Sequence, residues 1–314
     1  MTNDYNCIVL LGPTAVGKTS LGVRLAHELN AHIISADSRQ VYKGLDIGSG
    51  KDLKEYNYNG KQIPYHLIDI TDLSFEYNLY HYQTDFYKVF EDLKAQKQLP
   101  LVVGGTGMYI DSIVRGYEMV YVPENQQLRD SLESKSLEEL DNMLLQVKPD
   151  LHNRTDLEIR DRVIRALEIA YFMNENKDAA KNRNRPKISP FILGTTIERT
   201  SLRKNIQIRL KERLDEGMIE EVKALHDSGF SYHRLERLGL EYKFVAEYLQ
   251  GKFDKYEDFE NGLYTAICRF AKRQETWFRG MEKKGVKINW ISSENDKDIK
   301  FSSAMELIKK VNFV

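Results

Sequence analysis

One short segment near the N-terminus restricts the possible folds of this chain more than any other. The segment "GPTAVGKT", Gly12 to Thr19, matches G-x-x-x-x-G-K-[ST] at every fixed position. The apolar run Ile8 to Leu11 precedes it, and leucines recur every four residues after it, at Leu21, Leu25 and Leu29. A buried strand, a glycine-rich loop and a helix in this order form a P-loop, whose N–H groups surround phosphate oxygens. The motif predicts a phosphate-binding loop without saying which molecule carries the phosphates.

Alternation of strand-like and helix-like segments continues after this loop. Short apolar runs predict strands at 32–35, 63–70 and 99–103, and a helical pattern covers 86–98. A further strand, 191–198, is expected to return to the same sheet. Strands that alternate with helices indicate an α/β fold. We therefore expect a P-loop NTPase-like parallel sheet core.

The segment 118–187 has a different pattern, without a good strand. A capping box at Thr155 to Glu158 predicts the start of a helix that continues to about residue 173. Its apolar stripe is Ile159, Val163, Leu167 and Ala170. From about 201 to 284 the chain again has a helical pattern, followed by a strand-like 286–291 and a last helix. The predicted domains are a core of 1–117 plus 188–314, with a helical C-terminal part, and a helical insertion domain of 118–187.

Charge and cysteine content exclude several classes of protein. Charged residues make up 30% of the chain, but the net charge is −1, so it is not a globally basic nucleic-acid binder, although local basic patches remain possible. Two distant cysteines predict reduced thiols rather than a disulfide framework or a zinc site. The apolar runs are too short for a membrane span, and the N-terminus lacks the basic segment of a signal peptide. We expect a cytoplasmic protein.

Three side chains near the predicted phosphate site carry chemistry. Lys18 supplies a positive charge to the phosphates, and the Thr19 hydroxyl can bind Mg²⁺. Asp37 follows the second strand, at the sheet edge where open α/β sheets bind ligands. A carboxylate there suits a general base that acts on an acceptor group. The alternative is that Asp37 only caps a helix that begins near Ser38.

Further candidates are a glycine turn and several basic stretches. "GGTG", Gly104 to Gly107, follows a buried strand and offers the Thr106 hydroxyl to a ligand. The stretches 202–217 and 269–280 mix Arg and Lys with apolar residues, and Arg162 and Arg165 lie on the insertion helix. These cations are either solvated helix surfaces or contacts to a phosphodiester backbone, and the sequence leaves both open.

These motifs, in this order, resemble the tRNA dimethylallyltransferase family. The matching segments are "GPTAVGKTSL", "IISADSRQVYKGLDIGSGK", "IPYHLIDI", "LPLVVGGTGMYI", "RVIRALE" and "AKRQETWFRG". The resemblance implies that the enzyme transfers a dimethylallyl group from dimethylallyl diphosphate to tRNA. The acceptor would be the exocyclic amine of the adenosine on the 3′ side of the anticodon. The partner would be the tRNA anticodon stem-loop, and we expect a monomer.

The resemblance also implies roles for particular residues. The diphosphate would be bound by the whole P-loop: Gly12, Pro13, Thr14, Ala15, Val16, Gly17, Lys18 and Thr19, with the cofactor Mg²⁺ on Thr19. The catalytic residues would be Asp37, Thr106, Lys18 and Arg209. The tRNA contacts would be Asp37, Ser38, Arg39, Gln40, Thr106, Arg129, Arg162 and Arg165, to which the second basic stretch adds Lys272 and Arg273.

The sequence departs from the family pattern at two arginines and leaves other functions open. Asn205 and Glu241 stand where the family has Arg, and we expect both positions on the tRNA side, away from the diphosphate. The chief alternative function is a P-loop kinase of a nucleoside or small metabolite. The others are a non-catalytic, nucleotide-dependent RNA-binding protein and an enzyme that prenylates free adenine nucleotides.

Overall fold

The computed structural model describes residues 4–148, 159–176 and 185–314. The chain divides into two compact units, one of residues 1–117 and 186–314 and one of residues 118–185. The expected domain limits, 118 and 187, lie within two residues of this division. Below, these are called the core unit and the insertion unit.

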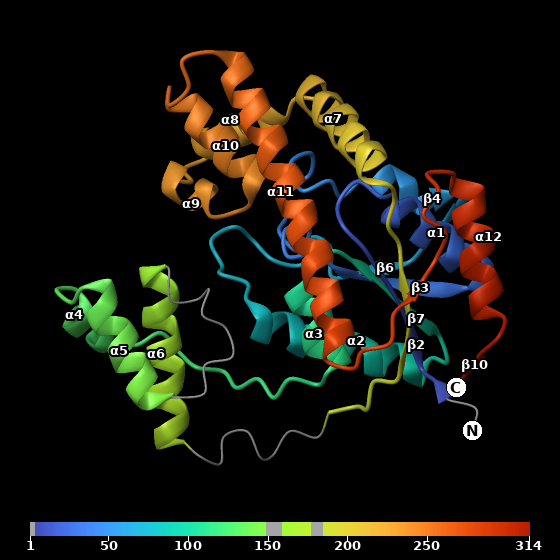
Figure 1. Cartoon of the computed structure of the whole chain (residues 1–314), viewed down its shortest axis with the longest axis horizontal. Coiled ribbons are helices and arrows are strands. Elements are labelled where there is room, and N and C mark those ends of the chain that lie inside the picture. The colour runs from blue at the N-terminus through green and yellow to red at the C-terminus, as the bar shows by residue number, and fades with distance from the viewer. Residues whose placement is uncertain (1–3, 149–158, 177–184) are drawn as a thin grey trace. The chain divides into compact units, whose positions relative to one another are not determined.

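A six-stranded parallel sheet forms the centre of the core unit (Figure 1). Its strand order is β6-β3-β7-β2-β8-β9. The bounds are β2 Cys7–Leu11, β3 Ala31–Ala36, β6 Tyr65–His66, β7 Leu99–Gly104, β8 Pro190–Gly194 and β9 Asn289–Trp290. All five strand pairs are parallel. The predicted α/β fold with a parallel sheet is confirmed.

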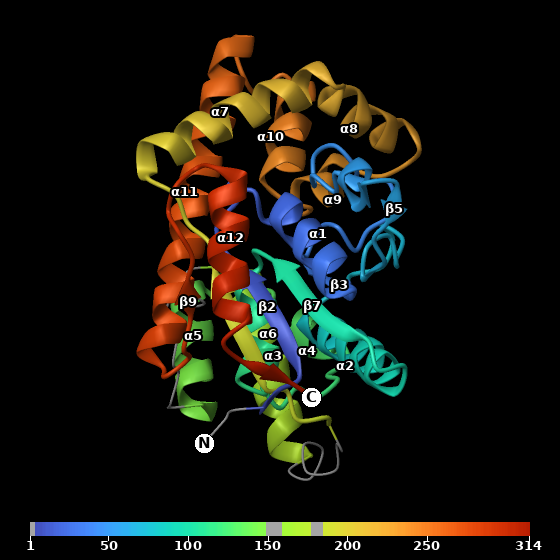
Figure 2. The same ribbon diagram turned by 90° about the vertical axis from the view of Figure 1, so that its right-hand side faces the viewer.

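Helices cover both faces of this sheet because its strands are apolar on both sides. Ile8 and Leu10 of β2 point into one core cluster with α1 (Lys18–Leu29) and α12 (Lys297–Ile308). Val9 and Leu11 point into another with α2 (Leu79–Ala95), α3 (Gly107–Val114) and the end of α11 (Tyr256–Lys283). Figure 2 shows α1 and α12 side by side on the first face.

The remaining elements of the core unit are small strands and the C-terminal helices. β1 (Asp4–Tyr5) pairs with β10 (Asn312–Phe313), and β4 (Asn57–Tyr58) pairs with β5 (Lys61–Gln62). A 3-10 helix, η1, covers Leu53–Tyr56. The helical C-terminal part comprises α7 (Arg199–Asp215), α8 (Met218–Asp227), α9 (Tyr232–Glu236), α10 (Leu240–Leu249) and α11. These helices share a third core cluster with Val16 of the P-loop.

Several expected elements differ from the structure in length. The strand expected at 63–70 shrinks to β6, because Leu67 and Asp69 have positive φ angles of 62° and 55° that turn the chain. The strand expected at 191–198 ends at Gly194, and residues 195–198 lead into α7, whose N-terminus the Glu198 side chain caps. The helix expected at 86–98 begins earlier, at Leu79, where Asn78 completes a capping box.

The insertion unit is built from three helices in its described part. These are α4 (Gln126–Leu132), α5 (Leu137–Val147) and α6 (Arg160–Glu175). Val163, Leu167 and Ala170 of the expected stripe are buried, but Ile159 precedes α6 and is 46% exposed, so that member of the stripe was wrong. The expected capping box at 155–158 lies outside the described residues. Throughout the described chain, no helix has the length and apolar character needed to cross a membrane.

Candidate active site

The P-loop lies where β2 ends and α1 begins. Gly12 follows β2, and a Cβ atom on it would lie 2.3 Å from the Thr195 carbonyl oxygen, so only glycine fits. Gly17, with φ 84°, is the N-cap of α1. Among the described residues, no side chain caps the N-terminus of this helix, and its first turn has no acidic residue. An uncapped helix N-terminus leaves N–H groups for an anion.

Lys18 points back into this loop. Its Nζ donates a 2.6 Å hydrogen bond to the Pro13 carbonyl. Burial, together with the nearby Arg209 guanidinium, lowers the pKa of Lys18 to about 7, although the Asp37 carboxylate opposes the shift. A bound anion would favour the charged form of Lys18. An anion bound in the P-loop would therefore stabilise the charge of Lys18, which burial disfavours.

The loops after β3 and β7 meet beside the P-loop. Gly104 is level with Leu11 of β2 and with Ala36 of β3, so the three strands end together. The Thr106 N–H donates to the Ala36 carbonyl at 3.1 Å, and the Thr106 hydroxyl accepts from the Ser38 N–H at 3.1 Å. The structure thus brings together the P-loop, the loop of Asp37 and the GGTG turn.

Asp37 lies directly after β3 and is half-buried. Its Oδ1 accepts a 2.9 Å hydrogen bond from the Arg39 N–H, and within the described chain its Oδ2 accepts none. The residues after Asp37 form turns, so the alternative that it caps a helix near Ser38 is wrong. This geometry leaves one carboxylate oxygen available to a ligand.

Gln274 of α11 links two of these loops, a role that was not predicted from the sequence. Its Oε1 accepts from the Thr14 N–H and its Nε2 donates to the Gly105 carbonyl, both at 2.8 Å. Gln274 is 7% exposed, whereas Lys272 and Arg273 before it are exposed. Their positive charge is the reason that Lys272 and Arg273 were predicted as site residues. The one sequence signal for Gln274 is that it is an uncharged amide within a basic stretch.

Two further residues that were predicted to contact tRNA, Gln40 and Arg39, follow Asp37 and differ in burial. Gln40 is buried; its Oε1 accepts from the Ser35 hydroxyl at 2.9 Å and its Nε2 donates to the Gly50 carbonyl at 3.1 Å. Gln40 therefore holds the following loop in place. Arg39 is half-buried and its side chain lies against Gly239, where a Cβ atom would be 3.3 Å from the Arg39 Nε.

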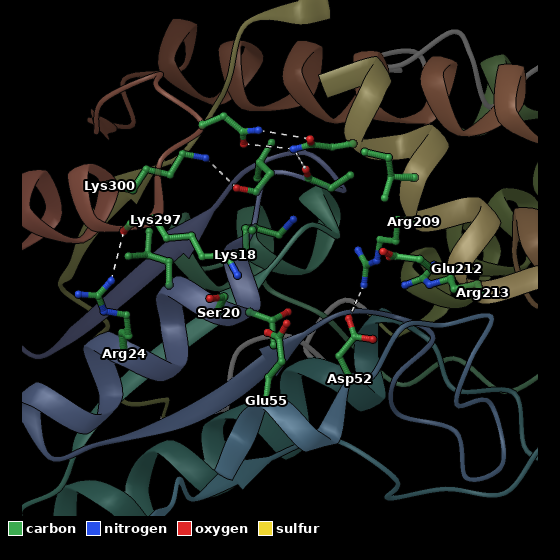
Figure 3. Close-up of a pocket in the computed structure, with 18 of the residues that line it drawn as sticks. Lys18, Ser20, Arg24, Asp52, Glu55, Arg209, Glu212, Arg213, Lys297 and Lys300 are labelled. Atoms are coloured by element: carbon green, nitrogen blue, oxygen red, sulfur yellow. Dashed lines mark hydrogen bonds and ion pairs between the residues drawn. The ribbon is translucent and has the colours of Figure 1, made fainter. Parts of the chain in front are cut away.

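A cleft of about 450 Å³ opens beside the P-loop (Figure 3). Its walls come from the P-loop with the start of α1, from α7, from Asp52 and η1, and from the segment that begins α12. Arg209 reaches across it and donates a 2.5 Å hydrogen bond to Asp52 Oδ2. The cations that line it are Lys18, Arg24, Arg209, Arg213, Lys297 and Lys300.

Of the two departures from the family pattern, Asn205 lines this cleft and Glu241 lies beside Arg213 of its wall. Asn205 donates a 3.2 Å hydrogen bond to the Ala15 carbonyl of the P-loop, so its expected position away from the diphosphate was wrong. Glu241 lies 3.7 Å from Arg213. Burial raises the pKa of Glu241, and the Arg213 charge opposes that shift.

Two arginines of the insertion unit, Arg129 and Arg165, form a structural network with Glu168. Glu168 Oε1 accepts from Arg129 Nε and Glu168 Oε2 from an Arg165 nitrogen, both at 2.7 Å. Burial would raise the pKa of Glu168, but these bonds and the Asn125 N–H lower it to about 2. Arg165 also donates to the Val122 carbonyl at 2.6 Å. Arg162 is exposed on the same helix. Arg129 and Arg165 thus hold α4, α6 and the segment before α4 together.

The site suits a metal ion that takes most of its ligands from substrate. Among the described residues, no three His, Cys, Asp or Glu side chains are grouped closely enough to hold a metal. Thr19 lies in the first turn of α1, in the wall of the cleft. Mg²⁺ commonly uses a few protein oxygens together with phosphates and water. The residues present fit that arrangement.

Comparison with known proteins gives consistent matches. The family model of IPP transferase matches residues 40–281, and that of isopentenyl transferase matches residues 5–63. A tRNA dimethylallyltransferase of Treponema denticola is 55% identical over 93% of this chain and 97% of its own. One from Syntrophus aciditrophicus is 49% identical over 94% and 96%. The crystal structure of a tRNA isopentenylpyrophosphate transferase from Bacillus halodurans has a TM-score of 0.70 at 30% identity, and the match covers 98% of this chain and 96% of that one.

Proposed function

Because this chain belongs to the IPP transferase family, we propose that it transfers a dimethylallyl group from dimethylallyl diphosphate to tRNA. The acceptor is the exocyclic amine of the adenosine on the 3′ side of the anticodon. One observation carries the proposal: the P-loop, Asp37 and Thr106 lie on loops that follow three strands ending together at one edge of the sheet. An anion-binding loop beside a carboxylate oxygen that accepts no hydrogen bond from the described residues suits a reaction in which diphosphate leaves and an amine loses a proton.

The donor diphosphate binds at the P-loop. The N–H groups at the start of α1 and the Lys18 ammonium stabilise the charge that develops on the leaving diphosphate. Arg209 shares this task from the cleft wall, where it would exchange its bond to Asp52 for a bond to phosphate. Mg²⁺, held by the Thr19 hydroxyl, diphosphate oxygens and water, would neutralise more of that charge.

The acceptor amine approaches from the side of Asp37. Its nitrogen forms a bond to the first carbon of the dimethylallyl group while the bond from that carbon to the diphosphate oxygen breaks. The Oδ2 atom of Asp37 takes the amine proton. Thr106 and Ser38 fix the loop on which this carboxylate lies. The adenine must leave its stack in the anticodon loop to reach the site.

The tRNA backbone is held by local cations, since the whole chain has a net charge of −1. Lys272 and Arg273 are exposed on α11, one helical turn or less from Gln274. Arg162 provides an exposed cation on the insertion unit. Arg129 and Arg165 contribute through the fold of that unit, because Glu168 takes their hydrogen bonds.

The test is product analysis on a defined tRNA. A transcript with adenosine 3′ to the anticodon and a matched transcript with guanosine there are incubated with the enzyme, Mg²⁺ and dimethylallyl diphosphate. Digestion and mass spectrometry of the nucleosides should detect dimethylallyladenosine from the first transcript alone. Phosphate transfer from ATP to a nucleoside, or prenylation of free adenine nucleotides but not of tRNA, would overturn the proposal.

A further inference from the structure

Lys300 is a buried cation that forms an ion pair with none of the described acidic side chains. It lies on α12, far from the P-loop in sequence, and is 4% exposed. Its Nζ donates a 2.8 Å hydrogen bond to the Val16 carbonyl of the P-loop. Among the described residues it forms no ion pair. Burial lowers the pKa of Lys300, because a charge removed from water without a counter-ion is costly.

The start of α12 is fastened to the P-loop helix in a defined position. An Arg24 nitrogen of α1 donates to Asp298 Oδ1 at 2.6 Å, and the Arg24 guanidinium lies 4.1 Å from the centre of the Phe301 ring. Figure 3 shows Arg24 and Lys300 on the side of the cleft where α12 begins. Lys300 therefore reaches the P-loop from a helix that α1 itself holds in place.

A second side chain, that of Asn205, binds the neighbouring carbonyl of the P-loop, on Ala15. Asn205 of α7 donates to the Ala15 carbonyl at 3.2 Å and pairs with the Asn295 amide before α12. Ala15 has a positive φ of 62°, a conformation that an L-residue adopts only when its surroundings hold it. Lys300 and Asn205 thus fix two consecutive carbonyls of the P-loop, on Val16 and Ala15.

We propose that Lys300 is a positioning residue of the diphosphate site, which holds the P-loop through the Val16 carbonyl and supplies a buried positive charge for the anion. Lys300 lines the same cleft as Lys18, and its charge also contributes to the lowered pKa of Lys18. A diphosphate at the P-loop supplies the negative charge that no described acidic side chain provides beside Lys300. The C-terminal helix α12 is then part of the donor site. The inference rests on the proposed diphosphate-binding role of the P-loop.

The experiment measures binding of inorganic pyrophosphate with Mg²⁺ by calorimetry, together with thermal melts. Lys300→Met keeps the length of the side chain and removes its charge and donor. Its affinity should fall about tenfold or more, as expected for a lost charge-assisted interaction. The melting temperature of the ligand-free variant should be equal to or above that of the wild type, because an unbalanced buried charge has been removed. Lys309→Met, at an exposed position just after the same helix, is the control and should bind like the wild type.

Two further measurements make the result decisive. In the prenyl-transfer assay, Lys300→Met should raise the KM for dimethylallyl diphosphate and leave the KM for tRNA unchanged. Asn205→Ala, which frees the Ala15 carbonyl, should weaken pyrophosphate binding in the same direction and tests the inference if Lys300→Met does not fold. The inference would be overturned if Lys300→Met bound pyrophosphate as tightly as Lys309→Met does. It would also be overturned if Asn205→Ala bound pyrophosphate as tightly as the wild type. Failure of the wild type to bind pyrophosphate would instead contradict the proposed function.

Discussion

The Thr106 hydroxyl accepts a 3.1 Å hydrogen bond from the backbone N–H of Ser38 and so joins the GGTG turn to the loop that carries Asp37. The Thr106 N–H also donates to the Ala36 carbonyl, on the other side of Asp37. Thr106 thus contacts both neighbours of the proposed base. In the proposed reaction, Thr106 would therefore fix the position of the carboxylate that takes the amine proton.

Thr106→Val tests this relationship, since it keeps the shape of the side chain and removes the hydroxyl. The Ser38 N–H then loses its partner, and the loop of Asp37 becomes less ordered. We expect the single-turnover rate to fall about tenfold or more, with a loss of about 1 kcal/mol in the free energy of unfolding. Thr106→Ser, which keeps the hydroxyl, should retain most of the rate. Equal rates for the Val variant and the wild type would show that this bond does not position Asp37.

Gln274→Leu should disturb the donor site from a distance in sequence. It leaves the Thr14 N–H and the Gly105 carbonyl without their partner, which should lower the free energy of unfolding by roughly 2–4 kcal/mol. Urea unfolding followed by tryptophan fluorescence measures this, because both tryptophans, Trp277 and Trp290, belong to the core unit. Thr276→Ala, at an exposed position on the same helix, is the control. A stability loss below that of the control would rule out the link.

Glu168→Gln should loosen the insertion unit and spare the core unit. The change removes a buried charge that two arginines share, so about 3 kcal/mol of local stability should be lost. Hydrogen exchange in α4 and α6 should become faster, while the tryptophan-detected unfolding of the core unit stays the same. Unchanged exchange in α6 would show that the Glu168 network contributes little.

Acid should weaken the insertion unit in the same way. The folded pKa of Glu168, about 2, lies below its ordinary value of 4.5, so its contribution to stability is fully present above about pH 5. That contribution is lost as the pH falls from 4.5 to 2, when the carboxylate gains a proton. Wild-type exchange in α6 should therefore rise across this range more than exchange in Glu168→Gln. The same pH dependence in both proteins would assign the effect to other carboxylates.

How far the sequence predicts this structure depends on how local each feature is. The P-loop, its flanking strand and helix, and the family were predicted correctly, because Gly12 to Thr19 and the apolar residues around it carry that information in one short segment. The strand at 63–70 was predicted too long, because the pattern of apolar residues does not reveal that Leu67 and Asp69 have positive φ angles. Gln274 and Lys300 were not predicted, because each reaches the P-loop only through tertiary packing of a distant helix. The bond between Arg165, which was expected to contact tRNA, and Glu168 was not predicted either, because nothing in the sequence indicates that Glu168 is buried.

Salt dependence should separate tRNA-binding cations from other surface charges. Lys272→Gln with Arg273→Gln should weaken tRNA binding and flatten the plot of log affinity against log salt by about one to two units. Lys309→Gln with Lys310→Gln changes the net charge by the same amount near the end of the chain and should leave the slope unchanged. Binding of labelled tRNA across a salt series measures both. Parallel lines with equal intercepts for the first variant and the wild type would exclude contact with the tRNA phosphates.

The single-turnover rate of prenyl transfer to tRNA by Asp37→Asn tests the central claim most directly. The asparagine can keep the bond from the Arg39 N–H but cannot take the amine proton. With dimethylallyl diphosphate saturating, the rate should fall by roughly 10²–10⁴, while the affinity for the donor stays within a few-fold of the wild type. A rate within a few-fold of the wild type would contradict the account, because the amine proton would then have another acceptor.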